Sequence, residues 1–184
     1  MKLNLGCGSR TLDGYLNVDK YGEPDLILDL EHLPWPWPDN SVESIFLSHV
    51  LEHLGADTDT YLNIFKEMYR VCQPNALIHI IVPHPRHDDF LNDPTHVRAV
   101  TPNGLALFSQ KKNRQWQQMG AANTPLGQII EVDFDLIETT MNLDPAWQKK
   151  LAEGQVTEEE IYHAERQYNN VVQSTQTILK AIKQ

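Results

Sequence analysis

The sequence of 184 residues predicts a single α/β domain built around a mostly parallel β-sheet. Three observations support this fold class. Short apolar runs alternate with helical and turn segments along the chain. Ala76–Val82 is almost entirely apolar, as in a strand that is covered on both faces. Between Tyr61 and Cys72, apolar residues recur every three or four positions, as on a helix that packs against a sheet.

The first four strands are predicted from short apolar runs that end in turn residues. These runs are Lys2–Leu5, Tyr15–Val18, Asp25–Leu28 and Val42–Leu47. Each of the first three leads directly into polar or glycine residues: Gly6-Cys7-Gly8, Asp19 and Asp29-Leu30, respectively. The proline-rich loop that follows contains Trp35 and Trp37, which we expect to pack under the edge of the sheet.

One long helix should connect the fourth and fifth strands. Asp57 or Asp59 can cap its first turn, and Pro74-Asn75 should end it, with Asn75 in the left-handed conformation. The fifth strand, Ala76–Val82, follows.

The pattern is weaker after Pro83. His84–Thr101 is polar and predicts a long, mobile functional loop, and Gln110–Gly127 is weakly specified and also expected to be mobile. The elements predicted beyond Pro83 are helical turns over Pro102–Phe108, a strand over Asp133–Leu143, a helix from the Thr157–Glu160 capping box to about Tyr168, and a strand over Val171–Ile182. Together these elements predict a Rossmann-like three-layer sandwich with a seven-stranded sheet, or six strands if the tail is helical.

The composition restricts the class of partner. Acidic residues outnumber basic ones by 25 to 15, giving a formal charge of −10, whereas nucleic-acid binding relies on lysine and arginine. We therefore expect a small-molecule or glycan acceptor and no nucleic acid. Without a long apolar run or signal peptide, and with only two cysteines, the expectation is a cytoplasmic protein with no membrane segment and no disulfide. The oligomeric state is left open.

A nucleoside site is predicted at the ends of the first two strands. Gly6-Cys7-Gly8 allows the backbone to approach a ligand closely, and the carboxylate of Asp19 can accept the two hydroxyls of a ribose. A dinucleotide site would need a third glycine, where Thr11 stands, and an acid about 20 residues further on. Asp19 comes sooner, and little room is left for a first helix. S-adenosylmethionine, which has no pyrophosphate, is the favoured ligand.

Several segments together resemble class I S-adenosylmethionine-dependent methyltransferases, and most closely the small type 11-like group. They occur in the order of that family: Leu3–Arg10, Asn17-Val18-Asp19, Asp29-Leu30 with Leu33-Pro34, Ser48–Leu54, Glu67–Pro74 and, in some relatives, Asp93–Arg98. The similarity is strongest over Met1–Pro83.

The resemblance implies a role for individual residues. Gly6, Cys7 and Gly8 would pass under the methionine part, with Asn4 nearby at a position where the family often has an acid. Asp19 would hold the ribose, and Asp29 with Leu30 would contact the adenine. Ser48 and His49 would lie near the sulfonium, and Arg10 would pair with the cofactor carboxylate. This set of cofactor-binding residues is Asn4, Gly6, Cys7, Gly8, Arg10, Asp19, Asp29, Leu30, Ser48 and His49.

Histidines supply the candidate catalytic groups. A general base for an oxygen or nitrogen acceptor is best provided by a histidine, and His96 is the first choice, with His49 and His84 as the others. His49-Val50-Leu51-Glu52-His53 also matches H-x-x-E-H, the motif of inverted zinc proteases. Because the motif follows a strand and leads into an α/β connection, no metal site is expected.

The sequence thus predicts one methyltransferase domain over residues 1–184. Its cofactor-binding half is 1–83, and the half that faces the acceptor is 84–184. The expected reaction moves a methyl group from S-adenosylmethionine to a small polar acceptor. Two alternatives remain: a regulatory or scaffold protein that binds S-adenosylmethionine or S-adenosylhomocysteine without catalysis, and an NAD- or nucleotide-sugar-dependent enzyme of Rossmann type.

Overall fold

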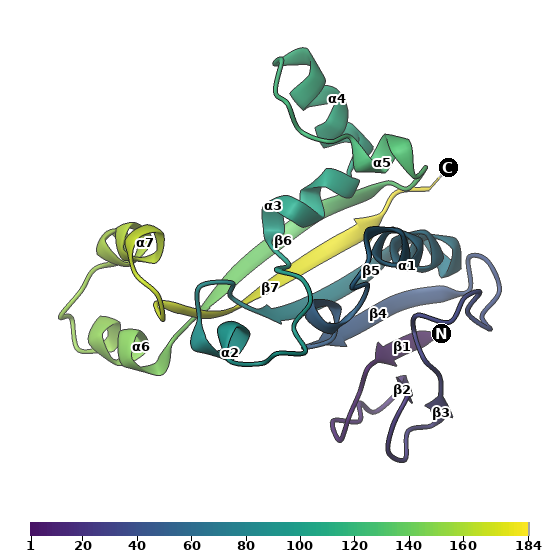
Figure 1. The fold of residues 1–184 in the computed structure, drawn as a ribbon, viewed down its shortest axis with the longest axis horizontal. Helices are drawn as coiled ribbons and strands as arrows, with labels where there is room; N and C mark the ends of the chain where they lie inside the picture. The colour runs from purple at the N-terminus through teal and green to yellow at the C-terminus, as the bar shows by residue number, and fades with distance from the viewer. Residues whose placement is uncertain (184) are drawn as a thin grey trace.

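The computed structural model describes residues 1–183 and contains one seven-stranded sheet of order β3-β2-β1-β4-β5-β7-β6 (Figure 1). The strands are β1 Lys2–Leu5, β2 Leu16–Asp19, β3 Leu26–Ile27, β4 Val42–Ser48, β5 Cys72–Pro83, β6 Phe134–Leu143 and β7 Val172–Ala181. Strands β1 to β5 are parallel, and β7 runs antiparallel to both β5 and β6. The α/β class, the strand number and the C-terminal strand are confirmed.

The helical elements lie between the later strands. They are η1 Leu51–His53, α1 Thr58–Val71, α2 Asp88–Leu91, α3 Pro102–Leu105, η2 Ala106–Phe108, α4 Gln110–Gln118, α5 Leu126–Ile129, α6 Pro145–Ala152 and α7 Glu158–Gln167. Across residues 1–183, no helix combines the length and apolar character that a membrane crossing requires. No helix connects β1 and β2, where the sequence left little room for a first helix.

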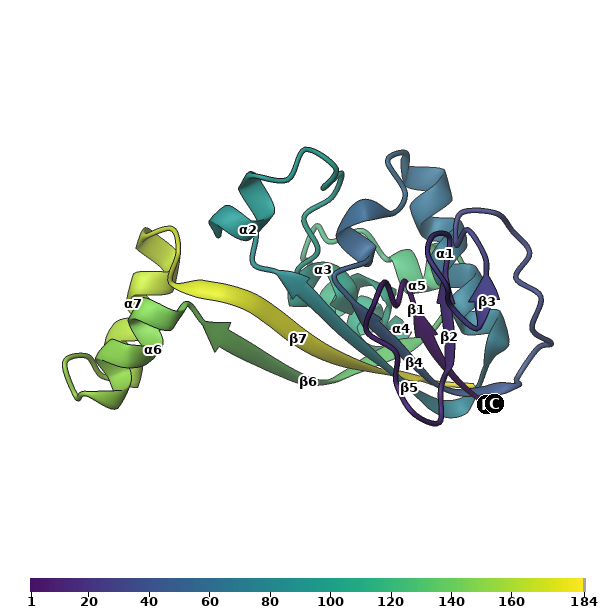
Figure 2. The ribbon, with the colours of Figure 1, turned by 90° about the horizontal axis from the view of Figure 1, so that it is seen from below.

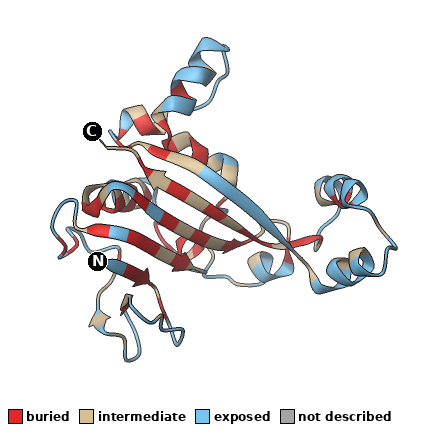
Figure 3. Ribbon diagram, turned by 180° about the vertical axis from the view of Figure 1, so that it is seen from behind, coloured by how far each residue is buried: buried red, intermediate tan, exposed pale blue. Residues whose placement is uncertain are grey.

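The main helices cover one face of the sheet. In Figure 2, α1 and α3 lie on the same side of the strands, and Figure 3 shows the opposite face of β5, β7 and β6 without helices over it. Burial alternates accordingly along β5: Ile78 and Ile80 are buried, but Leu77 is 38% exposed and His79 is only half-buried. The expectation that β5 is covered on both faces is therefore wrong.

Helix α1 forms as the sequence predicted at its start but ends earlier. The Asp57 side chain caps it by accepting from the Thr60 N–H at 2.9 Å. Its apolar face packs into the core, where Phe65 stacks on Phe108 with ring centroids 3.9 Å apart. The helix ends at Val71, and Asn75 adopts its positive φ of 66° inside β5. The left-handed residue thus accommodates an irregularity in the β4–β5 register and does not end the helix.

The segment Gln110–Gly127, expected to be mobile, contains ordered structure. Ser109 caps α4 by accepting from the Lys112 N–H at 3.3 Å. Asn113 is buried, and its amide donates to the Leu107 carbonyl at 2.9 Å. The sequence did not predict this helix, because a cap and a buried amide fix it and neither produces an apolar stripe.

Strands β6 and β7 form a long hairpin that extends beyond the main body and carries α6 and α7 at its end (Figure 2). We call residues 144–171 the α6–α7 tip. The tip has a small core of its own, separate from the main core, that is formed by Ile161, Ala164 and Val171 with Leu143, Trp147, Leu151 and Val156 around them. The predicted capping box is present in α7, where Thr157 and Glu160 bond reciprocally. Helix α6 is an element that the sequence analysis did not predict.

Candidate functional site

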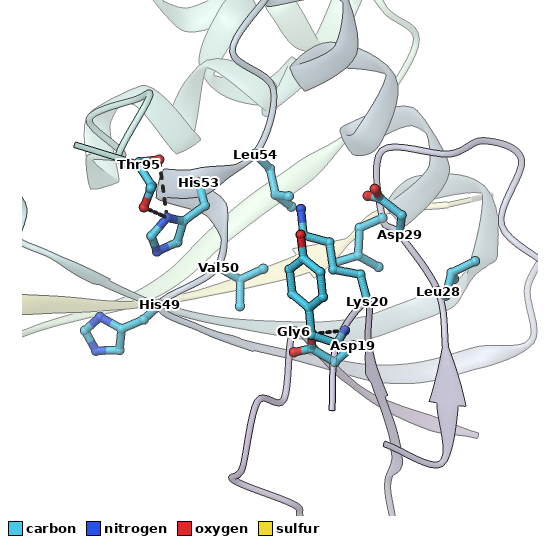
Figure 4. Close-up of a pocket in the computed structure, with 12 residues that line it drawn as sticks. Gly6, Asp19, Lys20, Leu28, Asp29, His49, Val50, His53, Leu54 and Thr95 are labelled. Atoms are coloured by element: carbon cyan, nitrogen blue, oxygen red, sulfur yellow. Dashed lines mark hydrogen bonds between the residues drawn. The ribbon is translucent and has the colours of Figure 1, made fainter. Parts of the chain in front are cut away.

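A cavity of about 410 Å³ lies where β1, β2 and β4 end (Figure 4). Residues from these strand ends, from the loop after β3 and from the segment after β5 line it. They are Gly6, Asp19, Lys20, Tyr21, Leu28, Asp29, Leu30, His49, Val50, His53, Leu54 and Thr95. Five of the predicted site residues, Gly6, Asp19, Asp29, Leu30 and His49, are thereby brought together. Because parallel strands end at the same edge of a sheet, this is where a ligand of such a fold binds.

Gly6 forms part of the wall at a position where a side chain does not fit. Its φ is 66°, and a Cβ there would lie 2.5 Å from Cγ2 of Val50. The backbone of β1 can therefore pass close to the element after β4 only because residue 6 is glycine. Gly8, in contrast, has a positive φ of 52° but open space where its Cβ would be.

The Asp19 carboxylate is held in place by two backbone donors. Oδ2 accepts from the Gly8 N–H at 2.8 Å, and Oδ1 accepts from the Tyr21 N–H at 2.9 Å. An ionised carboxylate offers about four lone-pair sites, so about two remain for a ligand. The turn after β1 and the end of β2 thus fix the acid next to the cavity.

The wall formed by Leu28, Asp29 and Leu30 is supported from beneath by Trp35. The Trp35 indole N–H donates to the Leu30 carbonyl at 3.0 Å, and its backbone N–H donates to Oε2 of Glu67 at 2.8 Å. Trp35 and Trp37 are both buried and meet edge to face, which confirms the packing role predicted for them.

An ion pair on α1 completes this support. Arg70 donates to both carboxylate oxygens of Glu67 at 2.8 Å and to the backbone carbonyls of Trp35 and Trp37. The hydrogen bonds from the Arg70 side chain lower the pKa of Glu67. Sequence reasoning missed this pair. Its only signal was the i, i+3 spacing of opposite charges on a predicted helix.

Five other predicted cofactor residues do not line the cavity. They are Asn4, Cys7, Gly8, Arg10 and Ser48. Asn4 has a structural role: its amide donates to Oδ1 of Asn17 at 2.9 Å and to the Arg10 carbonyl at 2.8 Å. These bonds hold the short connection between β1 and β2 in place of a helix. Cys7 is buried, and burial raises the pKa of its thiol, whereas Arg10 is exposed to solvent.

His49 follows β4 directly and reaches the cavity. Its φ of 57° lies in the left-handed region, which is uncommon for a residue with a side chain. The imidazole is 48% exposed, and its Nδ1 lies 3.5 Å from Oε1 of the buried Glu52. Such a departure from ordinary backbone geometry is typical of functional positions.

The other two candidate catalytic histidines lie elsewhere. His96 is packed between the rings of Phe90 and His53, and its Nδ1 is 2.8 Å from the Phe90 carbonyl oxygen. His84 lines a different cavity, of about 680 Å³, where its Nε2 lies 3.7 Å from Oε1 of Glu165. Burial is the main cause that lowers the pKa of His84. The structure does not bring His49, His84 and His96 together.

The segment His84–Thr101 is anchored along its length, although it was expected to be loosely attached. At its start, Arg86 donates to the Arg166 carbonyl at 2.7 Å, and the buried His87 lies 3.3 Å from Asp144. Towards its end, the Val97 N–H donates to the Glu52 carbonyl at 2.8 Å, and the Arg98 guanidinium stacks over Tyr61. These contacts are polar or aromatic and come from distant parts of the chain, which a sequence pattern does not reveal.

Several cavity residues were missed by sequence reasoning. Lys20 and Tyr21 follow Asp19, and Val50 follows His49, so their positions next to predicted residues were a usable signal. His53 and Thr95 are paired across 42 residues by a bond of 3.0 Å between His53 Nδ1 and Thr95 Oγ1. No local sequence pattern indicates that contact.

Comparison with known proteins agrees with this geometry. Residues 15–80 match a family model described as a methyltransferase domain. No curated protein sequence matches the chain. Among solved structures, a SAM-dependent methyltransferase from Archaeoglobus fulgidus is similar with a TM-score of 0.61 at 19% identity, over 97% of this chain and 85% of that one.

Two further structures are similar at comparable levels. A SAM-dependent methyltransferase from Methanosarcina mazei gives a TM-score of 0.57 at 13% identity, over 100% of this chain and 92% of that one. The 1,6-didemethyltoxoflavin-N1-methyltransferase of Burkholderia thailandensis, solved with 1,6-didemethyltoxoflavin and S-adenosylhomocysteine, gives 0.54 at 11% identity, over 99% and 71%. At these identities the structural similarity establishes the fold.

Proposed function

We propose that this chain is a class I S-adenosylmethionine-dependent methyltransferase of the type 11 group that transfers the methyl group to a small polar acceptor. The match of residues 15–80 to a methyltransferase domain and the similarity of the fold to SAM-dependent methyltransferases support this proposal. The cofactor of this domain is S-adenosylmethionine. The observation that carries the proposal is the cavity itself, in which Gly6, Asp19, Leu30 and His49 face one volume of about 410 Å³.

The cavity residues fit the parts of this cofactor. We assign the methionine part to the passage beside Gly6, where a Cβ would close the gap to Val50. The lone pairs of Asp19 that the backbone leaves free suit the two ribose hydroxyls. Asp29 and Leu30, held by Trp35, form the wall proposed for adenine. His49 then lies on the side where the sulfonium would be.

The chain contributes to the reaction mainly by positioning. When bound, the cofactor supplies an electrophilic methyl group, and the cavity wall must hold the acceptor atom in line with it. We propose that His49 takes the proton of an oxygen or nitrogen acceptor, because it alone of the three candidate histidines lines the cavity. Oε1 of the buried Glu52 lies 3.5 Å from its Nδ1.

The acidic surface supports a small acceptor over a polyanion. The formal charge of −10 would repel nucleic acid, and a cavity bounded by polar groups such as Thr95 and His53 suits a polar molecule. We infer a small-molecule or glycan acceptor that enters beside these residues.

The test combines binding with turnover. S-adenosylhomocysteine should bind in calorimetric titration, and a panel of sugars, phenols and amines should be screened for cofactor turnover with release of S-adenosylhomocysteine. With an accepted substrate, His49→Gln should lower kcat by about 10²–10⁴-fold while leaving the affinity for S-adenosylhomocysteine unchanged. The matched control is His163→Gln, at a histidine that is 63% exposed on α7.

Two results would contradict the proposal in different ways. Binding of S-adenosylhomocysteine without turnover of any acceptor would favour a non-catalytic binding protein. Turnover that is equal in wild type and His49→Gln would show that positioning alone suffices and would remove His49 from the chemistry.

A further inference from the structure

We infer that Glu52, His53 and His96 form a binding site for a divalent transition-metal ion beside the cofactor cavity. One ligand-capable atom from each of these side chains lies within 4.8 Å of the other two. Glu52 and His53 belong to η1, and His96 comes from the segment after β5. We call these three residues the Glu52 cluster.

Glu52 is the observation that points to a ligand. Its side chain has 0% exposure, and neither carboxylate oxygen has a hydrogen-bond partner among the described residues. The nearest basic group, Nδ1 of His49, lies 3.5 Å away. A buried carboxylate without hydrogen bonds is strongly disfavoured unless a cation or donor compensates it. A metal ion bound to the carboxylate would provide that compensation.

Each of the two histidines has its Nδ1 beside a protein oxygen. Nδ1 of His96 lies 2.8 Å from the Phe90 carbonyl oxygen, and Nδ1 of His53 lies 3.0 Å from the Thr95 hydroxyl. If each Nδ1–H donates to its oxygen, the lone pair of each ring is on Nε2. Metal-bound histidines characteristically donate their second nitrogen in this way, which fixes tautomer and orientation. The Asp93 carboxylate, 3.8 Å from Nε2 of His96, adds negative charge nearby.

The fold explains why the cluster differs from the motif seen in the sequence. On an α-helix, His49 and His53 of H-x-x-E-H would share a face. Here the positive φ of His49 precedes a short 3₁₀ helix, so His49 turns to the cavity. His96 supplies the second imidazole, because the Val97 N–H donates to the Glu52 carbonyl at 2.8 Å and holds the two segments together.

The donor set indicates the class of metal. One carboxylate oxygen and two imidazole nitrogens suit zinc and other divalent transition ions better than magnesium or calcium, which prefer oxygen alone. Three protein ligands leave a coordination position open. His53 also lines the cavity, so, if the proposed function holds, an oxygen of the acceptor could occupy that position. This inference departs from the expectation, drawn from sequence, of no metal.

The experiment measures metal binding in the absence of cofactor. Protein dialysed against EDTA and then freed of chelator should bind one Zn²⁺ in calorimetric titration, and Co²⁺ should give a visible d–d absorption spectrum. At zinc concentrations about a hundredfold above Kd, the Tm should rise by about 5–10 °C. MgCl₂ at the same concentration should give a much smaller rise.

Glu52→Gln and His96→Gln should each abolish the zinc-dependent rise in Tm, whereas His163→Gln should keep it. The metal-free Glu52→Gln protein should melt at or above the wild-type temperature, since the substitution removes an uncompensated buried charge. This second readout shows that loss of zinc binding is not loss of the fold.

Several results would overturn the inference. Absence of stoichiometric Zn²⁺ or Co²⁺ binding in wild type would do so, as would binding that persists in both variants. A fall in the Tm of metal-free Glu52→Gln would show that a protein group, such as the buried Nε of Arg98, already compensates the carboxylate. Titration with S-adenosylhomocysteine tests the proposed function separately, because its predicted contacts do not include the Glu52 cluster.

Discussion

At the scale of single residues, backbone hydrogen bonds fix the Asp19 carboxylate beside the cavity. Both carboxylate oxygens accept a backbone N–H, from Gly8 and from Tyr21, so the acid is oriented before any ligand binds. Little side-chain entropy is then left to lose on binding. The turn after β1 and the end of β2 thus fix the orientation of the carboxylate that we propose to bind the ribose hydroxyls.

Replacing Asp19 by alanine should weaken binding of S-adenosylhomocysteine by about a hundredfold or more. Two hydrogen bonds to a charged acceptor are lost, at about 1.5–3 kcal/mol each. Calorimetric titration measures the effect. Asp13→Ala, with the same change of charge at an exposed position in the same connection, is the control and should bind as wild type. Equal affinity of both variants would exclude Asp19 from the site.

Sequence predicted about half of the candidate cofactor residues, and the physical reason is the geometry of strand ends. Gly6 and His49 directly follow parallel strands and Asp19 is the last residue of one, so their convergence follows from the fold class alone. Cys7, Arg10 and Ser48 are neighbours of such residues, but their side chains leave the cavity. Thr95 depends on a contact across 42 residues with His53, which periodicity does not encode.

At the scale of elements, α1 supports the cavity through charge. Glu67 and Arg70 link the helix to the backbone of Trp35, which in turn holds Leu30. Hydrogen bonds from Arg70 lower the pKa of Glu67 below its ordinary value. The folded protein therefore binds fewer protons at this position than the unfolded chain does over the mildly acidic range.

Glu67→Gln should lower the free energy of unfolding by about 1–3 kcal/mol at pH 7, because charge-assisted hydrogen bonds are lost. The contribution of a carboxyl group with a lowered pKa is present above its unfolded value of about 4.3 and is lost as the pH falls through the folded value. The difference between wild type and variant should therefore shrink as urea unfolding is repeated from pH 7 to pH 3. Glu43→Gln, at an exposed position on β4, should differ little at any pH.

A constant difference between Glu67→Gln and wild type over that range would mean that the ionisation of Glu67 does not stabilise the fold. The Glu67 side chain would then stabilise the fold only through its shape.

The elements that sequence predicted well are those with an apolar pattern, such as α1 and β4. Helix α4 lacked such a pattern, since the only residue it buries is Asn113. In α6 the signal was local: Asp144 caps the helix and Pro145 occupies its first turn, but no residue of α6 is buried. The apolar run of β5 predicted helices on both faces of the strand, but helices cover only one face.

At the scale of the whole molecule, the apolar residues form two separate groups. The large core lies between the sheet and its helices, and the small one lies within the α6–α7 tip. A unit with few buried apolar contacts opens at lower free energy than one with many. The tip should therefore unfold locally before the main body does.

Hydrogen–deuterium exchange followed by mass spectrometry should show this directly. Peptides from α6 and α7 should exchange faster than peptides from β4 and β5 in the same sample, which serve as the internal reference. Exchange at equal rates in both regions would show that tip and body unfold as one cooperative unit.

The hydrogen bonds between the tip and the segment after β5 couple their movements, and tryptophan fluorescence can follow this coupling. Arg86, His87 and Asp88 contact residues of the tip, so a displacement of their backbone must move the tip or release it. Trp147 lies within the tip's small core, whereas Trp35 and Trp37 are buried beside α1. A variant with the substitutions Trp35→Phe, Trp37→Phe and Trp116→Phe would retain Trp147 as its only tryptophan. The emission of that single fluorophore would report movement of the α6–α7 tip.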